Sequence, residues 1–156
     1  MTIEDKRLLI QDISARLPYA VKVEHSSGFI GVLLDMTVHP LYGDDDRGDE
    51  IVDYLCYTRF FGDEDLIDIE TFKPYLFPMS SMTEEQKGEL SKLTDGEITH
   101  EGLTYSEGGT LVEYEVLFSY SLMCNVIDWL NKNHLDYRGL IEKGLAIDAT
   151  GKNIYP

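Results

Sequence analysis

Four neighbouring side chains near the end of the chain carry the most concentrated chemistry in this sequence. His134 stands beside Asp136, Tyr137 and Arg138, so an imidazole, a carboxylate, a phenol and a fixed cation occur within five residues. Imidazole changes charge near neutral pH and is the group that most often acts as a general acid or base. One hypothesis is therefore a small hydrolase-like enzyme that uses this His134 cluster.

A structural role accounts for the same four residues, and we favour it. Asp136 is placed to cap a short helix, and Arg138 is placed to pair with Asp136 or Glu142. Such pairs contribute little to stability where they are exposed. His134 follows a predicted helix, where its cationic form would face the negative end of the helix dipole. We therefore assign no catalytic residue.

A run of carboxylates between residues 44 and 50 is the second candidate site. Its members are Asp44, Asp45, Asp46, Asp49 and Glu50. Hard oxygen ligands suit calcium, but an EF-hand loop needs glycine at its sixth position and glutamate at its twelfth. Counted from Asp44, Gly48 is fifth and Leu55 is twelfth, so the spacing does not fit. We interpret the run as a solvated loop that offers an interaction surface.

Other familiar reaction centres are missing from the sequence. The 4 His and 2 Cys show no zinc-binding spacing. There is no Gly-x-Ser-x-Gly nucleophile motif and no phosphate-binding glycine loop. Cys56 and Cys124 lie in apolar surroundings, which predicts two buried free thiols rather than a disulfide or a nucleophile. We expect no metal and no cofactor.

The charge of the chain is strongly unbalanced. It has 29 acidic and 13 basic side chains, a formal net charge of −16, and the excess lies upstream of residue 129. This charge disfavours direct binding to nucleic acid and suits solubility or a basic protein partner. A sharper version of that hypothesis is a DNA mimic, whose carboxylates imitate phosphates and occupy a basic nucleic-acid-binding protein.

Apolar runs are short throughout. None approaches the roughly 18 residues of a membrane span, and the N-terminus lacks the apolar core of a signal peptide. We therefore expect a cytoplasmic protein without a membrane partner. At 156 residues and 43% hydrophobic content, the chain should form one domain over 1–156. The sequence does not define an oligomeric state.

The first half predicts one helix and several strands. Thr2 and Asp5 form a capping-box pattern for a helix that Pro18 ends. Alternating or continuous apolar residues predict strands at 19–24, 29–38 and 51–60, with a short fourth strand near 66–69. The sequence His39-Pro40 should stop the second strand. Gly31 is a candidate bulge.

The second half predicts more helices. Two prolines in 72–85 indicate an irregular connector that presses apolar side chains onto the core. A capping box at Thr83 should start a helix that ends near Leu93. Residues 97–118 predict a protruding hairpin, a candidate insertion, that turns at 107–109. A helix from Ser119 or Ser121, a short helix ended by Gly144, and an extended segment complete the chain.

Two stretches of this half also carry a resemblance. The connector Lys73–Glu85 and the tail Asp128–Ala146 together cover about a fifth of the chain. They resemble a group of small, uncharacterised bacterial proteins of the prophage or mobile-element type. That resemblance implies an accessory protein and supplies no activity, so no catalytic residue is transferred.

These patterns predict an α+β fold. We expect an antiparallel sheet of four to six strands, an N-terminal helix, and C-terminal helices packed on one face of the sheet. The favoured function is a non-enzymatic accessory or binding protein that engages another macromolecule through its acidic surface. The DNA-mimic inhibitor and the hydrolase-like enzyme are the alternatives.

Overall fold

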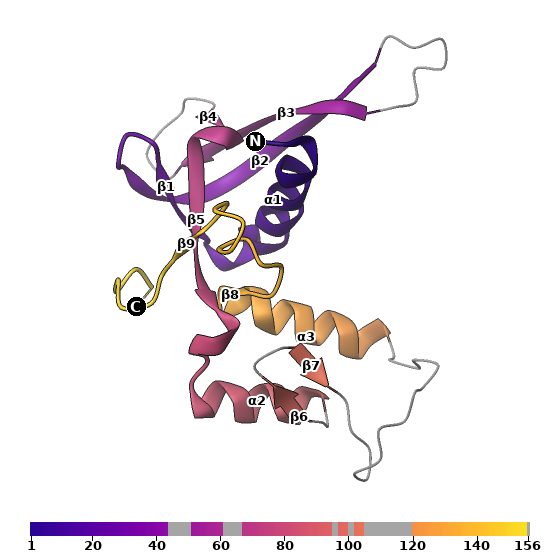
Figure 1. The fold of residues 1–156 in the computed structure, drawn as a ribbon, viewed down its shortest axis with the longest axis vertical. Coiled ribbons are helices and arrows are strands. Elements are labelled where there is room, and N and C mark those ends of the chain that lie inside the picture. Colours follow the sequence, from indigo (N-terminus) through magenta and orange to yellow (C-terminus); the bar gives the residue numbers. More distant parts are fainter. Residues whose placement is uncertain (44–50, 61–66, 95–96, 100–101, 105–119, 156) are drawn as a thin grey trace.

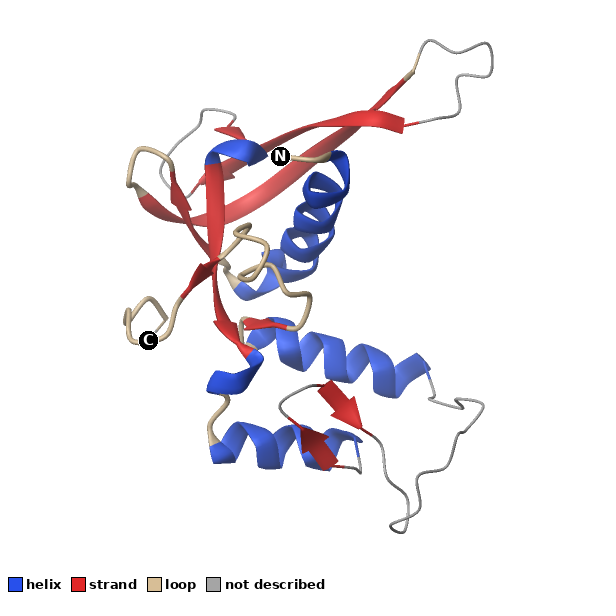
Figure 2. Cartoon of the chain, viewed as in Figure 1, coloured by secondary structure: helices blue, strands red, loops and turns tan. Residues whose placement is uncertain are grey.

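The structure, a computed structural model, describes residues 1–43, 51–60, 67–94, 97–99, 102–104 and 120–155. It has an α+β fold with an N-terminal helix, one mixed sheet and two later helices (Figures 1 and 2). The α+β class and the N-terminal helix were both predicted from the sequence.

Helix α1 (Ile3–Arg16) begins where the sequence predicts. The Thr2 hydroxyl oxygen accepts a hydrogen bond from the Asp5 N–H at 3.1 Å, which satisfies one of the free amides of the first turn. Pro18 lies in a 3-10 turn, η1 (Leu17–Tyr19), that follows the helix. The apolar face of α1 lies against the sheet, and Leu9 is fully buried there.

Four antiparallel strands form one side of the sheet. In spatial order they are β4 (Ile67–Asp68), β3 (Ile51–Phe60), β2 (Ile30–Tyr42) and β1 (Lys22–His25). The predicted turn before β2 is confirmed by Gly28, whose φ is +85°. The β2–β3 register shifts between Leu33 and Asp35 and again between Leu41 and Tyr42, rather than at Gly31.

The prediction that β2 ends at Pro40 is wrong, because the strand continues to Tyr42. Pro40 lies opposite Tyr54 of β3. The Tyr54 N–H donates to Asp53 Oδ1 at 2.7 Å, and the Tyr54 carbonyl accepts from Lys6 Nζ at 3.0 Å. Both backbone groups of Tyr54 therefore turn away from β2. The pair is of the non-hydrogen-bonded kind, which needs no N–H from a proline.

The predicted irregular connector also contains a strand, β5 (Phe72–Pro78). It pairs antiparallel with β1 and parallel with both β8 (Leu135–Asp136) and β9 (Ile147–Asp148). The sheet is therefore mixed and has seven strands, so the prediction of a purely antiparallel sheet is wrong. Parallel partners require a long crossover, and here the chain passes through both later helices before it returns to β5. Pro74 is the last residue that pairs with β1, and Pro78 ends the strand.

The later helices are α2 (Glu84–Thr94) and α3 (Tyr120–Lys132). The predicted capping box is confirmed, since Gln86 N–H donates to the Thr83 hydroxyl at 3.2 Å and Thr83 N–H donates to Gln86 Oε1 at 2.9 Å. Between the helices, β6 (Glu97–Thr99) and β7 (Gly102–Thr104) form a short antiparallel hairpin. The first arm of the hairpin predicted over 97–118 is thus itself a hairpin, and its second arm lies outside the described residues.

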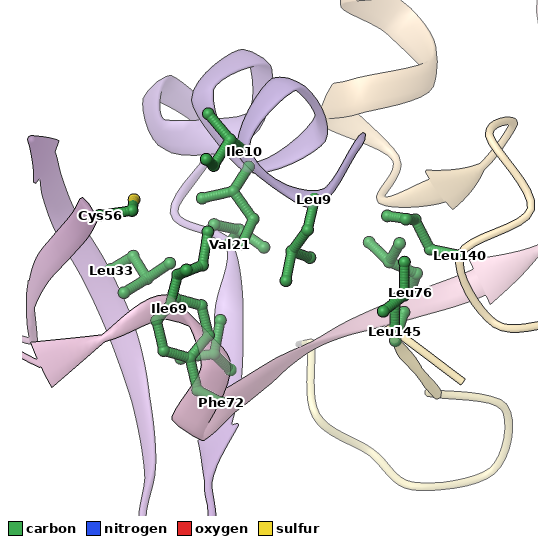
Figure 3. Close-up of a cluster of buried hydrophobic side chains, with 13 residues drawn as sticks. Leu9, Ile10, Val21, Leu33, Cys56, Ile69, Phe72, Leu76, Leu140 and Leu145 are labelled. Atoms are coloured by element: carbon green, nitrogen blue, oxygen red, sulfur yellow. The ribbon is translucent and has the colours of Figure 1, made fainter. Parts of the chain in front are cut away.

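Two hydrophobic clusters lie at different ends of the molecule. The larger one joins α1, the sheet and the tail, as Figure 3 shows for Leu9, Leu33, Leu76 and Leu140. The second cluster lies between α2, α3 and β8, and its buried members are Met82, Leu90, Val126, Leu130 and Leu135. Helices α2 and α3 pack on each other beyond the end of the sheet (Figure 1), so they do not lie across one of its faces as predicted.

The chain after α3 was predicted to form a second short helix, but it forms a series of turns instead. Gly139 adopts a φ of +71°, which a right-handed helix does not accommodate. The predicted left-handed Gly144 is confirmed, with a φ of +69°. The predicted extended segment is also present and forms β9.

Candidate functional site

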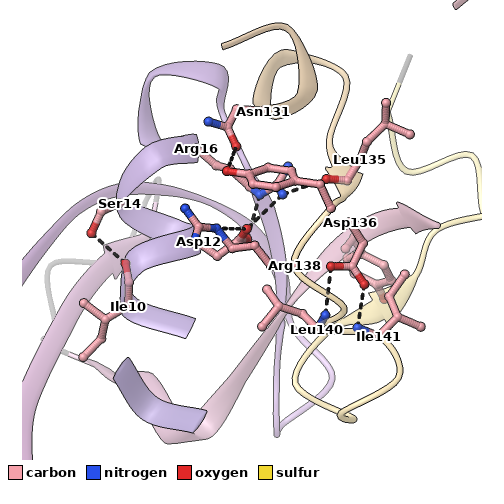
Figure 4. Close-up of polar contacts among 12 residues, drawn as sticks. Ile10, Asp12, Ser14, Arg16, Asn131, Leu135, Asp136, Arg138, Leu140 and Ile141 are labelled. Atoms are coloured by element: carbon pink, nitrogen blue, oxygen red, sulfur yellow. Dashed lines mark hydrogen bonds and ion pairs between the residues drawn. The ribbon is translucent and has the colours of Figure 1, made fainter. Parts of the chain in front are cut away.

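The structure separates the four residues of the His134 cluster into different environments. His134 faces the C-terminal segment, whereas Tyr137 and Arg138 face α1. Asp136 turns toward the turns that follow it. Figure 4 shows Asp136 beside Leu140 and Ile141, and Arg138 beside Asp12 of α1. These four side chains are close together in the sequence, but in the fold they do not converge on one point.

His134 is only 7% exposed and stacks on Tyr155, with ring centroids 3.8 Å apart and planes within 12°. Burial, helped by the nearby Arg16 and Lys22 cations, lowers the His134 pKa from 6.5 to about 4. The imidazole is therefore neutral at pH 7, so the cationic form that would face the helix dipole is not the one present at that pH. Its Nδ1 atom has no hydrogen-bond partner in the described structure.

Asp136 caps the turns, as its position in the sequence predicted. Its two carboxylate oxygens accept hydrogen bonds from the Leu140 and Ile141 N–H groups, each at 2.8 Å (Figure 4). Asp136 is 8% exposed. A carboxylate that is buried and bonded through both oxygens holds the backbone, and it has no oxygen directed at His134.

We name the buried contact between α1 and the tail the junction; it comprises Asp12, Arg16, Asn131, Tyr137 and Arg138. Asp12 and Arg16 are both fully buried. Arg16 donates to Asp12 through Nε at 2.7 Å and through Nη2 at 2.9 Å, and Nη2 also donates to the Leu135 carbonyl at 2.8 Å. This guanidinium therefore ties α1 to β8.

Arg138 belongs to the junction rather than to an exposed pair. Its Nε lies 3.5 Å from Asp12 Oδ1, so the predicted pairing with Asp136 or Glu142 is wrong. Both guanidinium groups of the junction lie against the Tyr137 ring, at 5.4 Å for Arg16 and 5.1 Å for Arg138. The Tyr137 hydroxyl lies 3.1 Å from Asn131 Oδ1 and donates to it. One buried carboxylate thus faces two cations held by an aromatic ring.

Tyr155 fixes the C-terminal segment to the sheet next to His134. Its hydroxyl accepts from the Lys22 N–H at 3.1 Å and donates to the Tyr75 carbonyl at 2.8 Å. Val23 and Pro74 form the last backbone pair between β1 and β5, and Lys22 and Tyr75 occupy the next position along this ladder. The phenol therefore extends the ladder by one side-chain bridge.

This geometry gives no support to hydrolysis by the His134 cluster. A general base has to reach a substrate proton, but His134 is buried, stacked and not bonded to Asp136. The carboxylate, the phenol and the Arg138 cation all have internal partners. We assign these residues to the architecture of the chain.

Sequence reasoning missed the two residues that organise the junction. Asp12 and Arg16 stand four residues apart in α1, a spacing that places them on one side of a helix. They share the buried face with Leu9 and Ile13. The sequence signal for a buried ion pair was the presence of two charged residues on the apolar side of a predicted helix.

The distal part of β2 and β3 is the opposite kind of surface. We call it the ribbon and define it as 36–42 of β2 with 51–58 of β3; it extends past α1 in Figure 1. Leu41, Tyr42 and Leu55 expose 37%, 56% and 40% of their surface. Leu55 lies opposite His39, so Leu41 and Leu55 are diagonal neighbours on one face. The inner face contains Cys56, which is buried, and burial raises its pKa to about 11.

Several predicted features have a plain outcome. The predicted surface of Asp44, Asp45, Asp46, Asp49 and Glu50 lies outside the described residues. Cys124 is free, as expected, but it is exposed on α3, so its predicted burial is wrong. Within the described ranges, no three His, Cys, Asp or Glu side chains converge to hold a metal, and no described helix is long and apolar enough to cross a bilayer.

A search of protein-family models, curated proteins and solved structures returns no match to this chain. The resemblance carried by the connector and the tail therefore stays a prediction.

Proposed function

We propose that this chain is a non-enzymatic binding protein that engages a basic macromolecular partner through its acidic surface and its ribbon. The observation that carries the proposal is the exposure of Leu41, Tyr42 and Leu55 on a two-stranded extension. Leu41 and Leu55 are neighbours on one face of this extension, and exposed apolar neighbours outside the core are typical of interaction sites.

Charge supports the choice of a basic partner. The net charge is −16, and five acids lie between Tyr42 and Ile51, the residues at which the two strands of the ribbon end and begin. Complementary charge accelerates association and directs the partner to one face. A partner with Lys or Arg around an apolar centre would match both properties.

The test is capture of the partner from the native cell, followed by binding measurements with a charge variant. Changing Asp44, Asp45, Asp46 and Asp49 to Asn should slow association and flatten its dependence on salt, because exposed charges act over about 8 Å at physiological ionic strength. A matched control changes Glu4, Glu84, Glu85 and Glu142 to Gln. These four side chains are exposed and lie outside the ribbon.

Equal binding by the wild type and the Asn variant, at every salt concentration, would show that residues 44–50 are only solvated. If both variants slow association equally, net charge acts without a local site. The DNA-mimic form of the proposal makes an additional prediction. Duplex DNA should then compete with this protein for the captured partner.

A further inference from the structure

The two edges of the ribbon differ. On the β3 side, Lys6 covers the Tyr54 carbonyl, and Thr58 pairs with Ile67 of β4. On the β2 side, β1 pairs only with residues 30–32, and among the described residues no strand lies along β2 beyond Leu33. The edge of β3 is therefore protected, while a stretch of β2 is left as an open strand edge.

The direction of the β2 backbone groups follows from Pro40. Tyr54 and Pro40 form a non-hydrogen-bonded pair, because both backbone groups of Tyr54 bond elsewhere. Bonded and non-bonded pairs alternate along an antiparallel ladder. The register is regular from Pro40 back to Met36. The pairs of Val38 and Met36 are therefore also non-hydrogen-bonded, and their N–H and C=O groups point away from β3. These groups, together with the Pro40 carbonyl, form a row of two donors and three acceptors.

Such a row is the template onto which an extended peptide adds as a further strand. Next to it, Thr37, His39 and Leu41 are exposed and would flank an added strand. We propose that the partner docks an extended, Lys- or Arg-containing segment along 36–40 of β2. This inference rests on the proposed function.

A segment of a basic partner fits this edge better than a second copy of this chain. Two copies would bring together two molecules that each carry a net charge of −16, and like charges oppose association. A basic strand gains the same backbone hydrogen bonds without this repulsion. Its binding must also weaken as salt rises.

The test uses the full chain and a fluorescent peptide of alternating Lys and Val. Val38→Pro removes an outward N–H that the β2–β3 ladder does not use, and Val38→Ala is the matched control that keeps it. We expect the wild type and the Ala variant to bind alike and the Pro variant to bind about tenfold more weakly. Thermal melts report whether each variant is folded. A copy of the peptide that is N-methylated on every second residue should lose affinity in the same way.

Three results overturn the inference. The first is equal binding of the peptide to the Pro and Ala variants, and the second is no binding of the peptide to the wild type. The third is a dimer in sedimentation that Val38→Pro abolishes, which makes a second copy the occupant. The Pro and Ala variants could also bind the peptide equally, with affinity that weakens as salt rises and when Asp44, Asp45, Asp46 and Asp49 are changed to Asn. That result would leave the proposed function standing without strand addition. Binding that is insensitive to both salt and those substitutions would contradict the proposed function as well.

Discussion

The junction and the ribbon reverse the usual relation between residue type and exposure. In the junction, Asp12 and Arg16 are charged and fully buried. In the ribbon, Leu41 and Leu55 are apolar and more than a third exposed. Buried charges with internal partners hold elements together, whereas exposed apolar side chains leave an interaction unmade. We therefore assign a structural role to the residues that resemble a catalytic site, and we propose recognition only for the β2–β3 strand pair.

Removing the tail is the largest test of the structural half of this comparison. A chain ending at Lys132 loses Leu135, Leu140 and Leu145, all buried. At roughly 1.5–3 kcal/mol each, the loss is about 5–9 kcal/mol, which is similar to the whole stability of a small domain, about 5–15 kcal/mol. We expect residues 1–132 to unfold or aggregate. Circular dichroism during a thermal melt checks this, and a cooperative, near-native transition would make the tail an appendage.

Asp12→Ala tests the charge of the junction itself. Arg16 and Arg138 would lose their shared carboxylate, and breaking a buried ion pair costs about 3–5 kcal/mol. Urea unfolding measures the change. The control is Glu4→Ala, which removes an exposed carboxylate from the first turn of the same helix and should cost less than about 1 kcal/mol. Similar losses for both variants would mean that the junction does not hold the fold.

His134 should make stability depend on pH. Its pKa is about 4 in the folded chain, against an ordinary value of 6.5. Between these two pH values the imidazole is protonated in the unfolded chain and neutral in the folded chain. The contribution of neutral His134 to the free energy of unfolding is fully present above pH 6.5, and it falls by about 2–4 kcal/mol as the pH drops toward 4.

His134→Phe keeps an aromatic ring for Tyr155 to stack on and does not titrate. The comparison is the difference in unfolding free energy between the wild type and this variant at pH 7 and at pH 4.5. A difference that stays constant between the two pH values would show that His134 is not held neutral by burial.

Tyr155→Phe has the smallest expected effect, because it keeps the ring and removes only the hydroxyl. The Lys22 N–H and the Tyr75 carbonyl would lose their bridge, and an unsatisfied polar group costs about 1–3 kcal/mol. Differential scanning calorimetry should show a lower melting temperature. An unchanged melting temperature would mean that water replaces the hydroxyl without loss.

Local signals predicted α1, β3, α2 and the turn before β2, because caps, alternation and turn residues act over a few positions. Proline was misinterpreted at Pro40 and Pro74, since its effect depends on whether a partner strand needs its N–H. The parallel pairing of β5 depends on residues more than 50 positions away. The site was harder to predict. Neighbours in sequence such as His134 and Asp136 diverge, while Asp12 and Arg138 meet across the fold.

Residue-resolved amide hydrogen exchange tests the central comparison most directly, because it measures the junction and the ribbon in one experiment. The Leu140 and Ile141 amides bond to the buried Asp136 and should exchange slowly. The Met36 and Val38 amides should exchange at least about a hundredfold faster, since no partner in the described structure protects them. If all four amides exchange equally slowly, the β2 edge is covered in the free protein, and the assignment of recognition to the ribbon is wrong.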